Sequence, residues 1–250
     1  MPITEPSAQP AYFDKFDASG SRASDAARQI LQTTRAFRSV PDAELVVLDV
    51  GCGYGYTSAA LATTCRRIVA IEPSPELFER SHNALAHVSN VELRPIGIEA
   101  VAERDTFDLA ILDNVLEHIG DQPGALQAIA AALKPGGLLY LLVPNKLWPL
   151  EPHYGLPFLS YLPLSLANQY LRLTRQGTDY TDASYAPTYG RLVRLLSAAG
   201  FDAHFVIPGD LSLTAGGGPL HYRVGAAALR HAPWLWRIAK GFLVIAVRRS

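Results

Sequence analysis

Cysteine is scarce in this chain, since Cys52 and Cys65 are the only two among 250 residues. Neither belongs to a CxxC pair or a Cys/His cluster, so a disulfide framework and a structural zinc site are excluded. Two reduced thiols are typical of the cytoplasm, where we expect this protein to reside.

Long apolar runs are missing as well. The longest runs, residues 138–144 and 242–247, have the length of single strands, whereas a membrane-spanning helix needs about 20 apolar residues. Residues 1–17 are polar, contain acids and prolines, and lack the apolar core of a secretory signal. We therefore expect no integral membrane segment.

A strong charge of either sign is absent too, because 22 basic and 23 acidic residues leave a net charge of −1. A nucleic-acid partner is not expected, since such partners require a basic surface. The apolar fraction of 49% and the charged fraction of 18% are typical of a globular protein large enough for a substantial core.

What the chain does contain is a regular alternation of short apolar strands and helices. Strands are predicted at 45–50, 68–72, 91–95, 107–112, 137–143, 201–207 and 242–247. Helices are predicted at 24–37, 57–63, 75–86, 122–133, 187–199 and 233–240, with Ser24 and Ser74 as N-caps and Pro135-Gly136 ending the fourth. Strands separated by helices indicate βαβ units, and therefore a parallel sheet covered on both faces.

This alternation is interrupted after Pro144 by a segment rich in aromatic residues and proline. We predict that this segment is an insertion over one end of the sheet. The chain then forms a single domain, residues 1–250, in four parts. These are an N-terminal helical lid at 1–40, a cofactor-binding core at 40–145, an inserted substrate cap at 146–187, and a C-terminal helix with the final strands at 188–250.

The sequence DVGCGYG, residues 49–55, follows the first predicted strand. Its glycines tolerate positive φ and have no Cβ, so a ligand can approach the backbone. The loop lacks the G-x-G-x-x-G spacing of dinucleotide sites and the GK[ST] of phosphate loops. Asp49 would repel a pyrophosphate but attract a cationic amino-acid group. Glu72 ends the next strand, where an acid can bind ribose hydroxyls.

Four segments together resemble the class I S-adenosylmethionine-dependent methyltransferases, in particular the bacterial small-molecule group. They are VVLDVGCGYG (46–55), VAIEPS (69–74), FDLAILDNVLEHI (107–119) and LKPGGLLYLLVPN (133–145). The resemblance implies an α/β fold with a Rossmann-like doubly wound sheet, mostly parallel with a reversed last strand, plus the inserted cap after strand 5. It also implies S-adenosylmethionine as methyl donor and S-adenosylhomocysteine as product.

The resemblance assigns cofactor contacts to positions that match the family motifs. The residues expected to bind the cofactor are Asp49, Gly51, Cys52, Gly53, Tyr54, Glu72, Pro73, Gly97, Ile98, Glu99, Asp113, Asn114 and His118. In this assignment the glycine loop holds the methionine part, Glu72 the ribose, residues 97–99 the adenine, and Asp113-Asn114 the side of the sulfonium. Many relatives have Asp where this chain has Ile98-Glu99, so the adenine contact departs from the family pattern.

A metal site is not expected from the sequence. Glu117 and His118 are adjacent, and adjacent side chains usually point in different directions. No H-E-x-x-H partner is present either.

The acceptor site is expected in the cap, directly after the fifth strand. Here His153 is the candidate general base, with Glu151 orienting it. The alternative is that both residues brace the loop. The candidate substrate-binding residues are Trp148, Tyr154, Phe158 and Tyr185.

The predicted reaction is methyl transfer to a small apolar or aromatic molecule, at oxygen, in biosynthesis. Three alternatives stay open at this point: methylation of nitrogen or carbon on a small or lipid-like acceptor, an NAD-dependent oxidoreductase, and a non-catalytic subunit with the same fold. Peripheral membrane contact through the apolar cap also stays open, as does the choice between monomer and homodimer.

Overall fold

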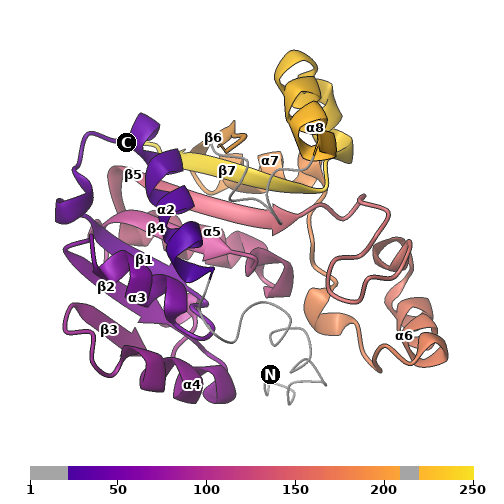
Figure 1. The fold of residues 1–250 in the computed structure, drawn as a ribbon, viewed down its shortest axis with the longest axis horizontal. Coiled ribbons are helices and arrows are strands. Elements are labelled where there is room, and N and C mark those ends of the chain that lie inside the picture. The colour runs from indigo at the N-terminus through magenta and orange to yellow at the C-terminus, as the bar shows by residue number, and fades with distance from the viewer. Residues whose placement is uncertain (1–21, 209–219) are drawn as a thin grey trace.

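The computed structural model describes residues 22–208 and 220–250, in which a seven-stranded sheet carries helices on both faces (Figure 1). The strand order is β3-β2-β1-β4-β5-β7-β6. The strands are β1 Val46–Val50, β2 Arg67–Ile71, β3 Val91–Arg94, β4 Phe107–Asp113, β5 Leu133–Pro144, β6 Phe201–Phe205 and β7 Gly241–Arg248. β7 pairs antiparallel with both β5 and β6, whereas the other pairs in the described sheet are parallel, so the predicted sheet with its reversed last strand is confirmed.

Seven α-helices are described, joined by loops and short 3-10 turns. They are α2 Ala23–Thr34, α3 Tyr56–Ala62, α4 Pro75–Leu85, α5 Gln122–Ala132, α6 Leu164–Thr174, α7 Tyr189–Ala198 and α8 Leu220–His231. None of the described helices is both long and apolar enough to cross a membrane.

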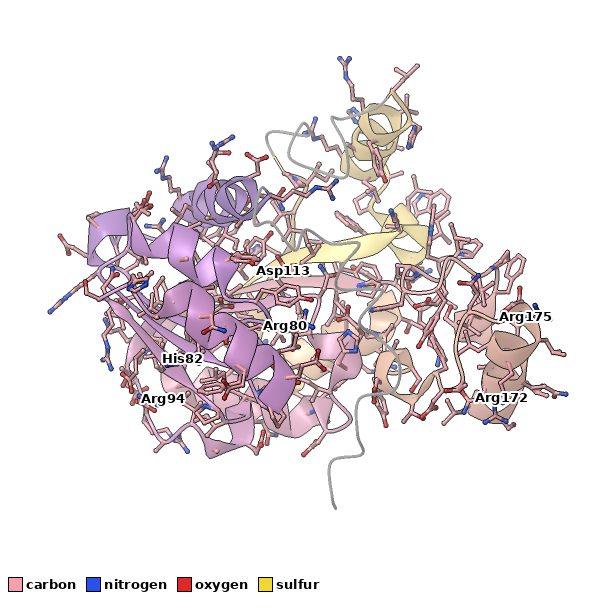
Figure 2. The ribbon with its side chains drawn as sticks, turned by 60° about the horizontal axis from the view of Figure 1, so that its bottom comes forward. Arg80, His82, Arg94, Asp113, Arg172 and Arg175 are labelled. Atoms are coloured by element: carbon pink, nitrogen blue, oxygen red, sulfur yellow. The ribbon has the colours of Figure 1, made fainter. Side chains whose placement is uncertain are left out.

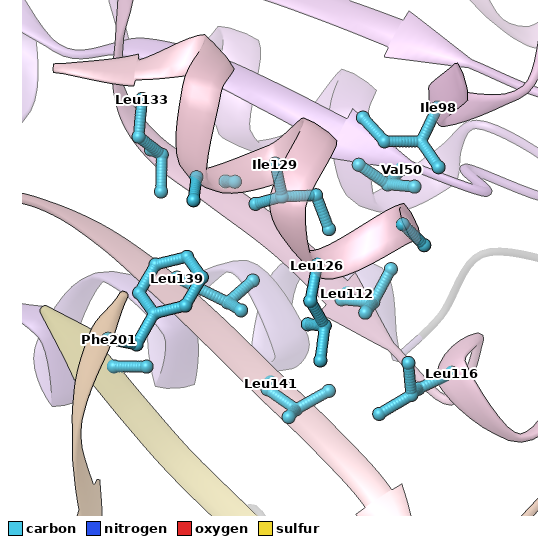
Figure 3. Packing of buried hydrophobic residues seen from close by; sticks show 14 of the residues in the cluster. Val50, Ile98, Leu112, Leu116, Leu126, Ile129, Leu133, Leu139, Leu141 and Phe201 are labelled. Atoms are coloured by element: carbon cyan, nitrogen blue, oxygen red, sulfur yellow. The ribbon is translucent and has the colours of Figure 1, made fainter. Parts of the chain in front are cut away.

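Alternate residues of the central strands supply two separate cores. In β1, Val47 packs into one core together with Ile30 of α2, whereas its neighbour Leu48 packs into the other. Figure 3 shows the second core, to which α5 contributes Leu126 and the edge strand β6 contributes Phe201. Because side chains of a strand point to opposite faces in turn, burying both faces requires an apolar residue at nearly every position.

The predicted element boundaries agree with the structure to within a few residues, with four differences. Ser74 caps α4 as predicted, since its hydroxyl accepts a hydrogen bond from the Leu77 N–H at 3.5 Å. Ser24 is not an N-cap, because α2 begins at Ala23 behind Arg22. Residues 233–240 were expected to be an α-helix, and Pro233–Ile238 is a 3-10 helix instead. Helices α6 and α8 were not predicted.

The fourth difference lies at the start of β5, which begins at Leu133 rather than at Gly137. Leu133 pairs with Phe107, and the register shifts before Leu138 pairs with Leu109. Gly136 has a φ of 76° within this irregular stretch. The helix ends near the Pro-Gly-Gly sequence as expected. The strand β5, however, begins at Leu133, directly after the helix, and already includes these three residues.

Between β5 and α7 the chain leaves the sheet and forms a small lobe with its own apolar core. Leu159, Leu171 and Tyr180 are buried there against each other. In Figure 1 this lobe lies beyond the tip of β5, with α6 at its far side. Asn145 fixes its base, because the amide Nδ2 donates to the carbonyls of Arg237 at 3.1 Å and Ala239 at 2.8 Å. We keep the name cap for residues 146–187.

The expected N-terminal lid falls partly on residues 1–21, which lie outside the described part of the chain. The described part is α2, which packs Ala27, Ile30 and Leu31 into the core that it shares with α3.

Candidate cofactor and acceptor site

The glycine loop follows β1 and has three residues in left-handed backbone conformations. Gly51, Gly53 and Gly55 have φ values of 69°, 57° and 76°. A Cβ on Gly51 would lie 2.9 Å from Val115, and one on Gly55 would lie 2.9 Å from Leu85. A Cβ on Gly53 would meet nothing within 4 Å. Gly51 and Gly55 are thus also required for packing, whereas Gly53 borders open space.

Asp49 lies at the end of β1, directly before the loop. It is 5% exposed, and its Oδ2 accepts a hydrogen bond from the Ser58 hydroxyl at 2.5 Å. Burial raises the pKa of Asp49 to about 6, and the hydrogen bond from Ser58 opposes that rise. Ser58 was not predicted as a site residue, although a hydroxyl in the first turn of the helix after the loop is a usable signal.

Glu72 follows β2 and is tied to the glycine loop. Its Oε2 accepts from the Gly53 N–H at 2.9 Å, and its Oε1 accepts from the Ser74 N–H at 3.0 Å. Burial raises the pKa of this carboxyl, and the two backbone hydrogen bonds counteract it. Glu72 therefore fixes the loop and still has lone pairs for a ligand hydroxyl.

Asp113 ends β4 and is the third acid at this edge of the sheet, near the centre of the molecule in Figure 2. Burial, followed by the charge of Asp49, raises its pKa to about 6. Asn114 has a φ of 53° and donates from Nδ2 to Asp113 Oδ1 at 2.7 Å. Among the described residues, no Lys or Arg forms a salt bridge with Asp49, Glu72 or Asp113.

Tyr140 of β5 is a neighbour of these acids that the sequence did not indicate. Its hydroxyl accepts from Gln29 Nε2 of α2 at 2.9 Å, and burial followed by the charge of Asp113 raises its pKa. A tyrosine inside an apolar strand is indistinguishable by sequence from ordinary core.

The residues expected at the adenine differ in exposure. Ile98 is buried in the core, whereas Glu99 and Pro73 are exposed. The Glu99 carboxylate folds back over Gly97, since both its oxygens lie 2.4 Å from the position of a Gly97 Cβ. Ile98 thus acts mainly as a packing residue, and the exposed side of this turn belongs to Gly97 and Glu99.

Cys52 and Tyr54 have different surroundings within the loop. Burial, followed by the charges of Asp49 and Glu72, raises the pKa of the Cys52 thiol far above its usual range, so this thiol is inert. The Tyr54 hydroxyl accepts from Arg80 Nη1 at 3.0 Å, and the Arg80 guanidinium lies 5.4 Å from the ring centre.

The predicted catalytic pair is formed inside the cap. His153 Nδ1 lies 2.6 Å from Glu151 Oε1, and Glu151 Oε2 accepts from the Tyr154 N–H at 2.8 Å. Glu151 is 2% exposed and His153 is 7% exposed. The His153 ring meets the His118 ring edge-on at 5.1 Å, so the cap brings the candidate base to a residue expected at the cofactor.

Glu117 is a buried acid that the sequence analysis did not assign to the site. It is fully buried, and neither carboxylate oxygen has a hydrogen-bond partner. Burial, then the charges of Asp113 and Glu151, raises its pKa to about 8. Burial and the neighbouring His153 lower the pKa of His118 to about 4. The sequence motif that could have indicated these two residues is LEHI, residues 116–119, which follows shortly after β4.

The four candidate substrate residues are divided between the inside and the outside of the cap. The Tyr154 hydroxyl donates to the Asp179 carbonyl at 3.0 Å, and the Tyr185 N–H donates to the Glu117 carbonyl at 3.2 Å. Both therefore lie beside the Glu151–His153 pair or Glu117. Trp148 is half-buried, whereas Phe158 is 56% exposed and packs edge-on against Tyr161.

Comparison with known proteins identifies one family, and the solved structures that resemble this chain have the same kind of fold. A family model described as "Methyltransferase domain" matches residues 22–204. A putative S-adenosylmethionine-dependent methyltransferase from Listeria monocytogenes is similar in structure at 17% identity, with a TM-score of 0.57 over 90% of this chain and 100% of that one. The CurJ carbon methyltransferase covers 96% of this chain and 58% of its own at 14% identity, with a TM-score of 0.59. These likenesses concern the fold alone.

Curated relatives with a printed activity match over a shorter stretch. The ubiquinone biosynthesis O-methyltransferase of Methylobacterium sp. (strain 4-46) is 35% identical over 109 residues, 42% of this chain and 43% of the relative. The enzyme of the same name from Neisseria meningitidis serogroup C is 32% identical over 165 residues, 62% of this chain and 63% of the relative. The match thus spans between two fifths and two thirds of each of these relatives.

Proposed function

The chain belongs to the methyltransferase domain family, and we propose that it transfers a methyl group from S-adenosylmethionine to a hydroxyl of a small apolar or aromatic molecule. The observation that supports the donor best is a set of three carboxylates, Asp49, Glu72 and Asp113, around a glycine loop. None of them has a Lys or Arg partner in the described chain. A ligand with net positive charge would compensate them, whereas a pyrophosphate would be repelled.

The donor would lie along the carboxyl ends of β1, β2 and β4. Its methionine part would lie at Asp49, Gly51 and the open side of Gly53, and its ribose at Glu72. The remaining cofactor contacts are proposed at Cys52, Tyr54, Pro73, Gly97, Ile98, Glu99, Asn114 and His118. Asp113 would face the sulfonium, whose charge disappears when the methyl group leaves. The product is then bound more weakly by the acids, which favours its release.

Methyl transfer is an in-line displacement at carbon. The acceptor oxygen forms a bond to the methyl carbon while the bond from carbon to sulfur breaks, and the electron pair of that bond stays on sulfur. Such a reaction depends mainly on holding the two reactants in line at roughly 3 Å.

The acceptor hydroxyl also loses its proton, and we assign that step to His153. Glu151 Oε1 lies 2.6 Å from Nδ1, and a carboxylate oxygen can only accept a hydrogen bond. Nδ1 of a neutral His153 therefore carries the ring proton, which leaves the lone pair on Nε2 to take the proton of the acceptor.

The acceptor class follows from the cap and from the relatives. Aromatic residues lie around this part of the cap. The Tyr154 N–H donates to Glu151, the Tyr185 N–H donates to the Glu117 carbonyl, and Trp148 is half-buried. Two matching relatives are named as O-methyltransferases, which supports oxygen as the acceptor atom. Phe158 would serve at the entrance, since it is 56% exposed.

Calorimetry with S-adenosylmethionine, S-adenosylhomocysteine and NADH tests the donor. We expect micromolar binding of the first two and none of NADH. Asp49→Asn should weaken binding at least tenfold because it removes one charge while keeping the shape. Glu79→Gln, an exposed acid on α4, is the matched control and should bind like the wild type. Binding of NADH in place of the two adenosyl compounds would overturn the proposal.

A further inference from the structure

Three side chains from two separate segments meet in the interior between β4 and the cap. Glu117, His118 and His153 each offer a ligand atom, and these atoms all lie within 4.8 Å of one another. We propose that these three residues bind a divalent transition-metal cation.

The imidazoles are oriented as metal ligands commonly are. His118 Nδ1 lies 2.8 Å from the Asp182 carbonyl, which can only accept a hydrogen bond, so Nδ1 carries the proton. Glu151 holds His153 in the same way through Nδ1 at 2.6 Å. Both rings therefore keep the Nε2 lone pair for coordination, and each has an outer partner that fixes its tautomer and direction.

Glu117 provides an independent reason to expect a cation. It is fully buried, and both of its oxygens lack a hydrogen-bond partner. A buried carboxyl without partners is costly, and structures retain such a group mainly where something outside the chain satisfies it. A cation between Glu117 and the two imidazoles would satisfy both oxygens at once.

The spacing is close to that of a bound site. His153 Nε2 lies 4.0 Å from Glu117 Oε1. Two ligands at about 2.0–2.1 Å from a tetrahedral ion are roughly 3.3 Å apart, so side-chain shifts below about 1 Å suffice. Glu117 and His118 belong to the 3-10 turn Leu116–His118, and their ligand atoms nevertheless lie within 4.8 Å of each other. The sequence argument that neighbouring side chains diverge does not hold at this turn.

Two nitrogens and one carboxylate oxygen select the kind of ion. This set suits zinc, iron(II), manganese or cobalt, whereas magnesium and calcium prefer oxygen ligands alone. Three protein ligands leave at least one position for a further oxygen ligand. That position is the expected place of the acceptor hydroxyl, whose proton a divalent ion makes easier to remove.

The placement of an acceptor hydroxyl on the ion rests on the proposed function, whereas binding of the ion itself does not. His153 Nε2 cannot hold a proton and an ion together. With the ion bound, the ion would lower the pKa of the acceptor hydroxyl and the proton would pass to bulk water, so His153 would be a ligand. His153 would act as the base of the proposed function only in the ion-free chain.

The test uses the tag-free full chain after treatment with a chelator. Equilibrium dialysis against zinc, cobalt(II), manganese and magnesium chlorides, followed by elemental analysis, gives the ions bound per chain. We expect one zinc or cobalt ion per chain, a rise in Tm on binding, no comparable effect of magnesium, and a cobalt absorption spectrum typical of nitrogen and oxygen ligands.

Variants locate the site. Glu117→Gln and His153→Ala should lose the ion, and Glu151→Gln should weaken binding roughly 10- to 100-fold because it removes the outer partner of His153. His87→Ala, which changes an exposed histidine in the turn after α4, is the control and should bind like the wild type. Circular dichroism checks that each variant folds.

Three outcomes would overturn the inference: wild type that binds no ion at micromolar concentration, Glu117 and His153 variants that bind as well as the wild type, or equal binding of magnesium. S-adenosylmethionine binding is measured on the same samples. A chain that binds the donor but no ion would refute the metal site and leave the proposed function intact.

Discussion

The carboxylate of Glu72 accepts the Gly53 N–H at 2.9 Å, so the residue that follows the second strand holds the loop that follows the first. The acid that we propose as the ribose contact is thus also a structural brace. Its second oxygen accepts the Ser74 N–H at 3.0 Å, which also holds the start of α4. The proposed donor site and the local fold therefore depend on the same side chain.

Replacing Glu72 should accordingly affect both binding and stability. Glu72→Ala leaves the Gly53 N–H without its acceptor, and we expect a loss of about 1–3 kcal/mol in the free energy of unfolding. Donor affinity should fall further than this loss of stability explains, because the ribose contact is also removed. Urea unfolding and calorimetry measure the two effects, with Glu79→Gln as the control. Unchanged donor affinity would remove Glu72 from the proposed site.

Two glycines of the same loop should respond differently to alanine. At Gly55 a Cβ would lie 2.9 Å from Leu85, so Gly55→Ala should destabilise the protein by more than the ~1–2 kcal/mol that a left-handed alanine costs. At Gly53 nothing lies within 4 Å, so Gly53→Ala should cost only that amount. Its Cβ would instead occupy the space assigned to the donor and weaken donor binding.

The backbone strain of a left-handed alanine is nearly the same in both variants, so any further difference comes from the surroundings of the Cβ. Thermal unfolding measures the stability of each variant, and calorimetry measures its donor affinity. If Gly53→Ala bound the donor as well as the wild type, the open side of Gly53 would not be the donor site.

The sheet could be predicted because its signals are local. In β1 and β4 nearly every residue is apolar, and this pattern is produced by burial on both faces. The glycine loop and Glu72 were likewise predictable, since each directly follows a strand whose neighbours in the sheet are implied by the βαβ order.

The part that could not be predicted depends on contacts between distant segments. Glu117 looks like a surface acid in the sequence, and only the cap, more than 30 residues later, buries it against His153. The orientation of His118 similarly requires the Asp182 carbonyl. Helix α6, which begins at Leu164, was not predicted. The run before it is rich in proline and aromatic residues, and this composition hides the helical spacing of its apolar residues.

The acids of the donor site should give donor binding and protein stability opposite pH dependences. Asp49 has its pKa raised to about 6 by burial, from an unfolded value near 3.8. Between these values the folded chain binds more protons than the unfolded chain, so the contribution of Asp49 to stability falls as pH rises through that window. Donor binding requires the ionised form and therefore weakens as pH falls below about 6.

The variant Asp49→Asn isolates this contribution from the other titrating groups. At pH 7.5 the wild type has paid the cost of ionising a buried acid, about 3 kcal/mol for the shift of its pKa, and the variant has not. The variant should therefore gain stability relative to the wild type at pH 7.5 and lose most of this advantage at pH 4, close to the unfolded pKa. Urea unfolding at the two pH values measures the difference, and an advantage equal at both would contradict the assignment.

The last prediction concerns the cap and separates chemistry from donor binding. His153 is 7% exposed, its Nδ1 is held by Glu151, and its ring packs edge-on against His118, a proposed cofactor contact. We expect His153→Ala to lower kcat roughly 10²- to 10⁴-fold, whether the residue removes the proton itself or holds an ion that lowers the pKa of the acceptor hydroxyl. Donor affinity should stay within about twofold, because none of the three donor-site acids accepts a hydrogen bond from His153. Release of S-adenosylhomocysteine from a panel of phenols and alcohols gives kcat, and calorimetry gives the donor affinity. His87→Ala is the matched control. If His153→Ala kept full kcat, the Glu151–His153 pair would have only the bracing role in the cap.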